Sequence, residues 1–271
     1  MDKKGILNRQ YIKELSGYIS DPDIKNISVS GLYASAKSFA LSSTVTSGIH
    51  IVILHKREEA AGFINDLYNL IGEDNVFFFP PSKDFSTKVQ RTAAIGAVVD
   101  YKKGVSPHPY IVLVGYKESF DEGVLEEKLL KKSIISIKVG DHISHEFFKE
   151  VLFDSAFTKA DFVSQPGEFA IRGSLIDVFS YGDSHPYRID FFGDEIESIK
   201  IFNANTQRSE KEVNSLDIYP NITSSSESEF TVPVLEFLPQ ESVVWVGDTD
   251  KPDFYTNLIY LLYLLKEELH Q

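Results

Sequence analysis

Two uninterrupted apolar runs most constrain the fold of this chain: "HIVILHK" at 50–56 and "YIVLVGY" at 110–116. Short runs of this kind, rich in β-branched residues, are typical of parallel strands that are buried on both faces. Strand and helix patterns alternate around them: strands at 24–32 and 75–80, helices at 35–45, 57–72 and 90–104. This alternation predicts an α/β layer with a parallel sheet over residues 1–132.

The pattern changes near Ser133, where short strand-like segments separated by turn residues begin. They predict a mostly antiparallel β domain over 133–220, with one helix at 143–154. Its expected strands lie at 133–139, 169–179, 187–192, 198–202 and 216–220. A polar segment follows, and residues 221–271 then read as a linker and the start of a further small α/β segment, with a strand near 243–246 and a terminal helix at 254–268.

Composition narrows the classes of function. The chain of 271 residues has no cysteine, which excludes disulfides and thiolate metal sites and suits a reducing, cytoplasmic setting. No apolar run reaches the ~20 residues that span a bilayer, so we expect no membrane partner. The formal net charge of −13 disfavours a DNA-binding module, because duplex binding depends on Lys and Arg that neutralise phosphates.

The stretch "YRIDFF" at 187–192 places a phenylalanine on a polar face. Side chains alternate along a strand, so Tyr187, Ile189 and Phe191 share a core-facing side, whereas Arg188, Asp190 and Phe192 share the other. The same alternation in "FAIRG" puts Arg172 on the non-core face of a strand that we expect to be a neighbour. Either another element of the chain, such as the 203–209 loop or the 143–154 helix, covers Phe192, or a partner does.

A phosphate-loop pattern is present in degenerate form. "GLYASAKS" follows a predicted strand and opens a predicted helix, and Gly31, Lys37 and Ser38 occupy places in G-x-x-x-x-G-K-[ST]. Ala36 replaces the second glycine, whose freedom lets the loop curl around phosphates. The strand "YIVLVGY" also ends without the carboxylate that would hold Mg²⁺. We therefore expect a loop without nucleotide binding, no catalytic residue, no metal and no cofactor.

The stretch "QPGEFAIRGSLIDVFSYGDSHPYRIDFFGDEIESIKIFNANTQRS" at 165–209 closely resembles the N-terminal module of bacterial transcription-repair coupling factors (Mfd), and more distantly the excision-repair protein UvrB. The shared elements are Pro-Gly-Glu-Phe at 166–169, Arg-Gly at 172–173, Asp177, Arg188, "DFFGDEIESI" and "TQRS". The resemblance implies a degenerate RecA/helicase-like parallel α/β domain with an inserted, mostly antiparallel β domain. Ala36 agrees with the Mfd side of this resemblance, because UvrB keeps an intact phosphate loop.

The resemblance also implies the function: a non-catalytic module that binds UvrA and so brings nucleotide excision repair of DNA damage to stalled RNA polymerase. Arg172, Arg188 and Phe192 match the positions that the family uses to contact UvrA. The complete factor, a DNA translocase, would also bind RNA polymerase and double-stranded DNA, and we expect this chain to be its N-terminal fragment or a short stand-alone relative. The alternative is a nucleotide-binding fragment of a UvrB-like ATP-dependent helicase.

Simpler interpretations exist for several of these residues. Arg172 and Arg188 would form a surface ion pair with Asp177 or Asp190 if they did not meet a partner, and such pairs contribute little. The pair His142 and His145 lies near two carboxylates, yet a zinc site needs three or four converging ligands. The acidic residues Asp194, Glu195 and Glu197 surround an expected turn, and we interpret them as a solvated edge.

Overall fold

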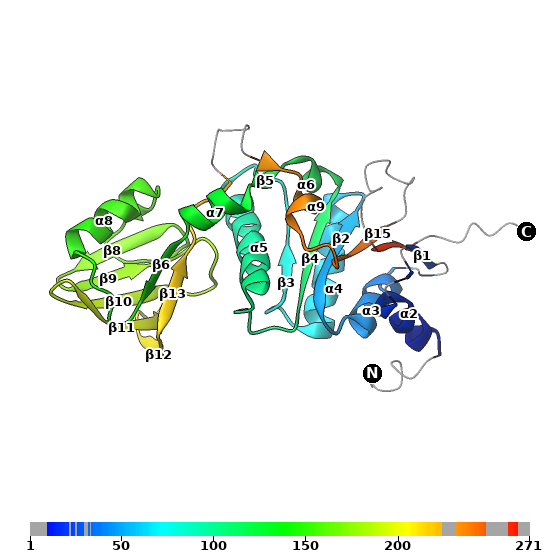
Figure 1. Ribbon diagram of the computed structural model, residues 1–271, viewed down its shortest axis with the longest axis horizontal. Coiled ribbons are helices and arrows are strands. Elements are labelled where there is room, and N and C mark those ends of the chain that lie inside the picture. Colours follow the sequence, from blue (N-terminus) through cyan, green and yellow to red (C-terminus); the bar gives the residue numbers. More distant parts are fainter. Residues whose placement is uncertain are drawn as a thin grey trace, which may run out of the picture. The chain divides into compact units, whose positions relative to one another are not determined.

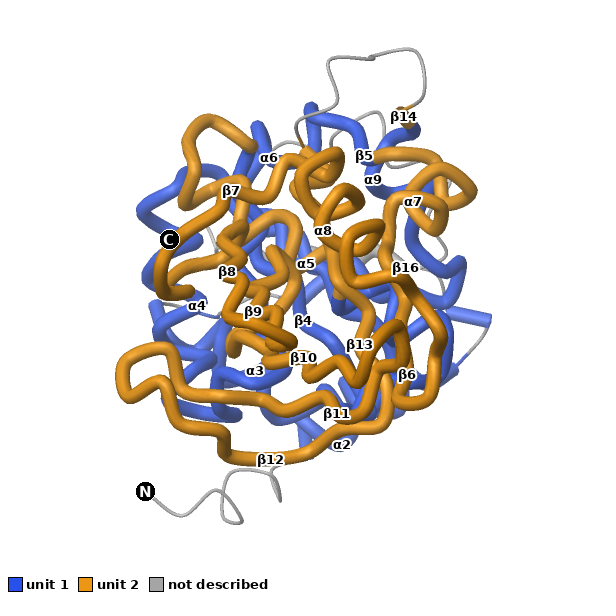
Figure 2. The backbone as a smooth tube through the Cα atoms, turned by 90° about the vertical axis from the view of Figure 1, so that its left-hand side faces the viewer, with its two compact units in different colours: residues 1–81, 97–124, 232–271 blue, residues 82–96, 125–231 orange. Residues whose placement is uncertain are grey.

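The computed structural model describes residues 10–21, 23–24, 26–29, 32, 34–223, 231–247 and 260–264, the last range by its backbone alone. It is a mixed α/β structure with parallel and antiparallel sheets (Figure 1). The chain divides into two compact units (Figure 2). Unit 1 comprises residues 1–81, 97–124 and 232–271, and unit 2 comprises residues 82–96 and 125–231. Within the described residues no helix is long and apolar enough to cross a membrane.

Unit 1 is built on a six-stranded sheet in the order β1-β16-β15-β2-β4-β3. Every pairing in it is parallel, as the apolar runs of the sequence predict. Its strands are β1 (Asn26–Val29), β2 (Gly48–Leu54), β3 (Val76–Phe78), β4 (Tyr110–Tyr116), β15 (Val243–Gly247) and β16 (Tyr260–Leu264). Its helices are α2 (Gln10–Ser20), α3 (Ala36–Thr44), α4 (Arg57–Ile71), α6 (Lys117–Asp121) and α9 (Val234–Phe237).

The helix α5 (Phe85–Lys103) begins five residues before the predicted range. Asp84 and Thr87 explain the earlier start, because they cap it reciprocally: the Asp84 carboxylate accepts from Thr87 N, and Thr87 Oγ1 accepts from Asp84 N, both at 2.9 Å. The apolar pattern alone did not reveal this cap.

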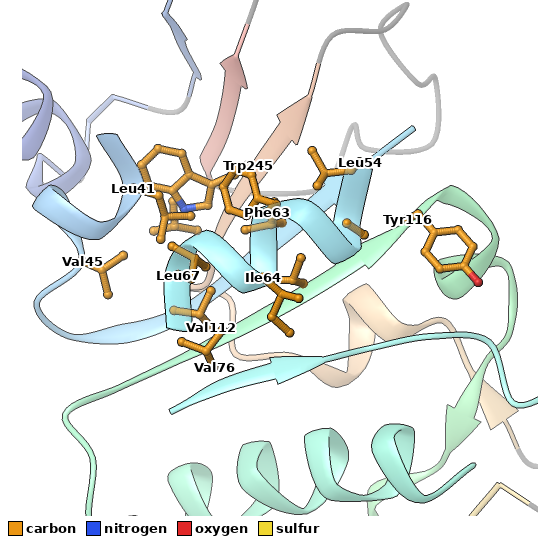
Figure 3. Packing of buried hydrophobic residues seen from close by; sticks show 14 of the residues in the cluster. Leu41, Val45, Leu54, Phe63, Ile64, Leu67, Val76, Val112, Tyr116 and Trp245 are labelled. Carbon is orange, nitrogen blue, oxygen red and sulfur yellow. The ribbon is translucent and has the colours of Figure 1, made fainter. Parts of the chain in front are cut away.

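The core of unit 1 packs α3 and α4 against one face of the sheet. Figure 3 shows the indole of Trp245, from β15, among Leu41 of α3 and Phe63 of α4, and all three are buried. The Trp245 indole Nε1–H donates to His50 Nδ1 on β2 at 3.1 Å, while His50 Nε2 lies 3.0 Å from the carbonyl oxygen of Ser47. This contact links two adjacent strands through side chains as well as backbone.

The C-terminal prediction was wrong in one respect. Tyr260–Leu264 lies within the helix predicted at 254–268, but it forms the strand β16, which pairs with both β1 and β15. A short apolar run fits either structure by periodicity, and here parallel neighbours on both sides fix it as a strand. The remaining residues of that helix lie outside the described part. Both β15 and β16, predicted to begin a further α/β segment, add to the sheet that contains β2.

Unit 2 contains a second six-stranded sheet in the order β12-β11-β10-β9-β8-β7, antiparallel except for the β7–β8 pair. Its strands are β7 (Thr158–Lys159), β8 (Glu168–Arg172), β9 (Leu175–Val178), β10 (Tyr187–Phe192), β11 (Glu195–Phe202) and β12 (Ser209–Val213). A separate pair joins β6 (Ile135–Lys138) to β13 (Ser215–Ile218). A further pair, whose residues fall on both sides of the division between the units, joins β5 (Val124–Leu125) to β14 (Thr231–Val232). The helices are α7 (Glu127–Ser133) and α8 (His145–Asp154).

The predicted strand 169–179 is two strands, because the chain reverses at Gly173–Ser174 between β8 and β9. Gly173 has φ +63°, which suits a glycine in a tight turn. As a result β9 lies between β8 and β10, and the expectation that "FAIRG" and "YRIDFF" are neighbouring strands is wrong.

One face of this sheet carries the core of unit 2, which includes Phe148 and Leu152 of α8. Figure 1 shows the labelled position of α8 beside the strands of this sheet. Ile189 and Phe191 of β10 belong to it, as the alternation predicts. The pairing of β10 with β11 shifts between Asp190 and Phe191, where β11 carries one extra residue. This bulge keeps Phe191 opposite Ile196 on the core face while the preceding residues keep their own register.

Candidate functional site

The candidate site lies on the other face of the β8–β9–β10 sheet. Asp177 on β9 is directly opposite Arg188 on β10 and Ala170 on β8. Arg172 ends β8, two residues after Ala170. This face carries charged side chains, but it is not fully open to water. A small apolar cluster covers part of it: Val163, Ala170, Phe179 and Phe202, with Ala204 at its side. The loops at 160–166 and 203–208 supply Val163 and Ala204.

The side chain of Arg188 is mostly buried between the sheet and the loops that cover this face. Its Nε donates to Asp177 Oδ1 at 2.7 Å and its Nη2 donates to Asp177 Oδ2 at 2.9 Å, which is the two-pronged geometry of a strong pair. The guanidinium carbon lies 4.8 Å from the ring centre of the buried Phe202. The hydrogen bonds to Asp177 raise the pKa of Arg188 above its ordinary value. The side chain is 18% exposed.

Arg172 shares the same carboxylate from the other side. Its Nη2 donates to Asp177 Oδ2 at 2.7 Å and to Gln207 Oε1 at 3.2 Å. Its guanidinium carbon lies 4.7 Å from the ring centre of Phe162, which is exposed. Asp177 itself is only 2% exposed, so one buried carboxylate joins two arginines. The ion-pair alternative is therefore realised for both arginines, with Asp177 rather than Asp190 as the partner.

Gln207 ties the covering loops to the arginines. Its Nε2 donates to the carbonyl oxygens of Val163 and Ala204, at 3.0 and 2.7 Å. The backbone carbonyl oxygen of Gln207 accepts from Nη1 of Arg188 at 3.4 Å. Gln207 has φ +59°, a left-handed conformation that is uncommon outside glycine. Its role could not be read from periodicity, although it stands in the quoted "TQRS" motif.

Phe192 lies at the end of β10, before the turn into β11. It is 76% exposed, more than any other large apolar side chain in the described part of the chain. The alternative in which the 203–209 loop or the 143–154 helix covers it is therefore wrong. The hairpin beneath it is held by backbone contacts: His142 bridges Glu195, and Ile143 N donates to Asp194 O at 2.8 Å. The exposed Phe192 therefore lies beside a turn that is held by backbone contacts to residues 142 and 143.

The degenerate phosphate loop is only partly described, because Gly31 lies outside the described residues. Ala36 begins α3, and Lys37 follows it. Ser38 is fully buried, and its Oγ lies 2.8 Å from Asp66 Oδ2 on α4 and 2.9 Å from the carbonyl oxygen of Ser35. The hydroxyl that would ligate Mg²⁺ in a working loop is therefore engaged between two helices of the chain.

The other clusters that we considered do not form sites in the described part of the chain. There, no group of three or more His, Asp or Glu side chains is placed to hold a metal ion. The ring of His145 packs edge-on against Phe191 at 5.1 Å rather than converging with His142. Asp194, Glu195 and Glu197 are exposed around the β10–β11 turn.

Comparison with known proteins gives a consistent result. Residues 135–223 match the family model described as the UvrB interaction domain. A transcription-repair-coupling factor of Bacillus subtilis is 27% identical over 205 residues, which is 73% of this chain and 17% of that protein. Those of Haemophilus influenzae and Escherichia coli are 31% and 32% identical over 130 and 109 residues, which are 48% and 40% of this chain and 11% and 10% of those proteins. The chain thus spans less than a fifth of these relatives.

Proposed function

We propose that this chain, which carries the UvrB interaction domain and is homologous to transcription-repair-coupling factors, is a non-catalytic recruitment module that binds UvrA. The docking site is the face formed by Arg172, Arg188 and Phe192. Within a longer factor, the module would bring excision repair to stalled RNA polymerase, while other parts bind polymerase and double-stranded DNA.

The exposed Phe192 is the observation that carries this proposal. An apolar ring that is 76% exposed does not stabilise the fold by burial, but burial against a partner would stabilise a complex. The ring also lies on the same face of the sheet as the two arginines, inside the matched region 135–223. Aromatic residues and arginine are the types most enriched among interface anchors. The covering loops and the buried carboxylate hold the arginines in place before a partner arrives, which lowers the entropic cost of binding.

We further propose that unit 1 is a degenerate RecA/helicase-like domain without nucleotide binding. Its parallel sheet and the position of α3 after a strand support the relationship. Ala36 and the engagement of Ser38 with Asp66 support the loss of the nucleotide site. The runner-up, a nucleotide-binding fragment of a UvrB-like helicase, would require the loop to bind phosphates with Ala36 in the place of its second glycine, and Ser38 to leave Asp66.

The test is calorimetric titration of UvrA with the wild type and with Phe192→Ala. Truncating an anchor of this kind costs about 2 kcal/mol, roughly thirtyfold in affinity. The unfolding free energy should stay within about 0.5 kcal/mol, since the ring is exposed. Phe147→Ala is the matched control, because Phe147 is 59% exposed on α8, whose Phe148 packs into the core on the opposite face of the sheet.

Equal affinity for UvrA in the wild type, Phe192→Ala and Arg172→Ala, with all three proteins folded, would show that UvrA docks elsewhere or not at all. A loss of affinity in Phe147→Ala as large as that in Phe192→Ala would place the site on α8 instead.

A further inference from the structure

The two arginines of the site stack on aromatic rings in different environments. Arg188 lies over Phe202, which is fully buried, whereas Arg172 lies over Phe162, which is 61% exposed. The side chain of Arg172 is also twice as exposed as that of Arg188, 36% against 18%. One arginine–ring pair is therefore internal, and the other stands at the surface.

The guanidinium group of Arg188 also uses more of its nitrogens in hydrogen bonds within the chain than that of Arg172 does. All three nitrogens of Arg188 donate within the chain, two of them to Asp177 and the third to the Gln207 backbone. Arg172 donates from Nη2 alone, and its Nε is buried without a partner. Among the described residues nothing accepts a hydrogen bond from its Nη1. The free donor capacity of the site therefore belongs to Arg172.

We propose that Arg172 and Phe162 touch UvrA directly, and that Arg188 and Asp177 are positioning residues that act through Arg172. This inference rests on the proposed function and refines it. Phe162 becomes a third contact residue beside Arg172 and Phe192, supplied by the loop at 160–166 rather than by a strand. Asp177 fixes Nη2 of Arg172, the Phe162 ring supports one face of its guanidinium, and Nη1 is left to meet the partner.

The arrangement specifies the chemistry of the matching surface on UvrA. A carboxylate must approach the Nη1 donors of Arg172, since a planar guanidinium recognises a carboxylate with direction as well as charge. The same surface must also carry apolar side chains that cover Phe162 and Phe192. A lysine in place of Arg172 would keep the charge but lose both the stacking and the fixed fork of donors.

The experiment combines UvrA titrations with denaturant unfolding. Phe162→Ala should weaken UvrA binding at least about fivefold and leave the unfolding midpoint unchanged. Phe147→Ala, which removes a ring of similar exposure from α8, is the matched control and should bind normally. Arg188→Lys should lower the unfolding midpoint as well as the affinity, since it breaks the two-pronged contact with Asp177.

A double-mutant cycle separates contact from positioning. If Arg188 acts through Arg172, then Arg188→Lys has little further effect on UvrA binding when Arg172→Ala is already present. Fully additive losses would overturn the assignment and make Arg188 a contact residue. Wild-type affinity in Phe162→Ala, together with weakened binding by Phe192→Ala, would refute this inference and leave the proposed function standing. Wild-type affinity in every variant, Phe192→Ala included, would refute the proposed function itself.

Discussion

Replacing Asp177 by asparagine removes the one buried carboxylate that both arginines share. The side chain is 2% exposed and receives three charged hydrogen bonds, of 2.7, 2.7 and 2.9 Å. The amide keeps the shape but supplies one acceptor oxygen, and its NH₂ group would face guanidinium donors. Two positive charges would then stand without a counter-charge in a partly buried layer.

The expected cost is about 3 kcal/mol, because leaving one partner of a buried pair alone costs about 3–5 kcal/mol and these arginines reach solvent in part. For a unit of this size that corresponds to a fall in melting temperature of roughly 10 °C. Circular dichroism during denaturant and thermal unfolding measures it. Trp245, the only tryptophan of the chain, lies in unit 1, so its fluorescence follows that unit separately.

Asp190→Asn is the matched control, because Asp190 lies on the same face of the sheet as Asp177 but accepts, within the described part of the chain, from Ser174 Oγ alone, at 3.0 Å. It should change the unfolding free energy by less than about 0.5 kcal/mol. A loss below about 1 kcal/mol in Asp177→Asn, or an equal loss in both variants, would refute the argument that Asp177 organises the site.

Three further outcomes are expected. The chain should neither bind ATP tightly nor hydrolyse it, so phosphate release that exceeds background and disappears in Lys37→Ala would contradict the degenerate loop. Duplex DNA should bind weakly at ~150 mM salt, given the net charge of −13, and a gel shift with a nanomolar midpoint would contradict this. Burial lowers the pKa of His50 from 6.5 to about 4, against a smaller opposite effect of the Ser47 carbonyl, so the unfolded state binds the proton first and stability falls by about 3 kcal/mol as the pH drops from 6.5 to 4. His50→Gln should remove most of that loss, and an unchanged pH dependence in this variant would show that His50 is not responsible.

Side-chain alternation was sufficient to predict the faces of β10. Ile189 and Phe191 lie in the core, as the pattern in "YRIDFF" predicts. The pattern left open whether the chain itself covers Phe192, and the structure shows this side chain exposed. The parallel sheet of unit 1 was predictable for a similar reason, since fully buried strands must be apolar on both faces. These are local properties of the sequence, and each has a period that can be counted.

The network around Asp177 could not be predicted in that way. It depends on two loops that return to the sheet, and on a left-handed backbone at Gln207 that no periodicity signals. The position of β9 between β8 and β10 was missed because "FAIRGSLIDVF" reads as one apolar run, although its Gly-Ser pair is a turn signal. That strand brings Asp177 between the arginines, so the missed turn is also the reason why a carboxylate expected in a surface ion pair is instead buried and shared by both.

The charges of the site lead to a last expectation, about salt. Arg172 and Arg188 are balanced on this face by Asp177 and by Asp190, so the site has little net charge to attract a partner over distance. Recognition then depends on short contacts: the directed donors of Arg172 and the apolar rings of Phe162 and Phe192. Long-range steering is screened by salt, whereas contacts of this kind depend on it much less. We therefore expect the affinity for UvrA to change less than about tenfold between 50 and 200 mM salt, far less than the change of about a thousandfold or more for a protein that neutralises many phosphates. Titrations across that range measure the slope. A steep loss of affinity would show that charge attraction, rather than the Phe162 and Phe192 contacts, dominates binding at this face.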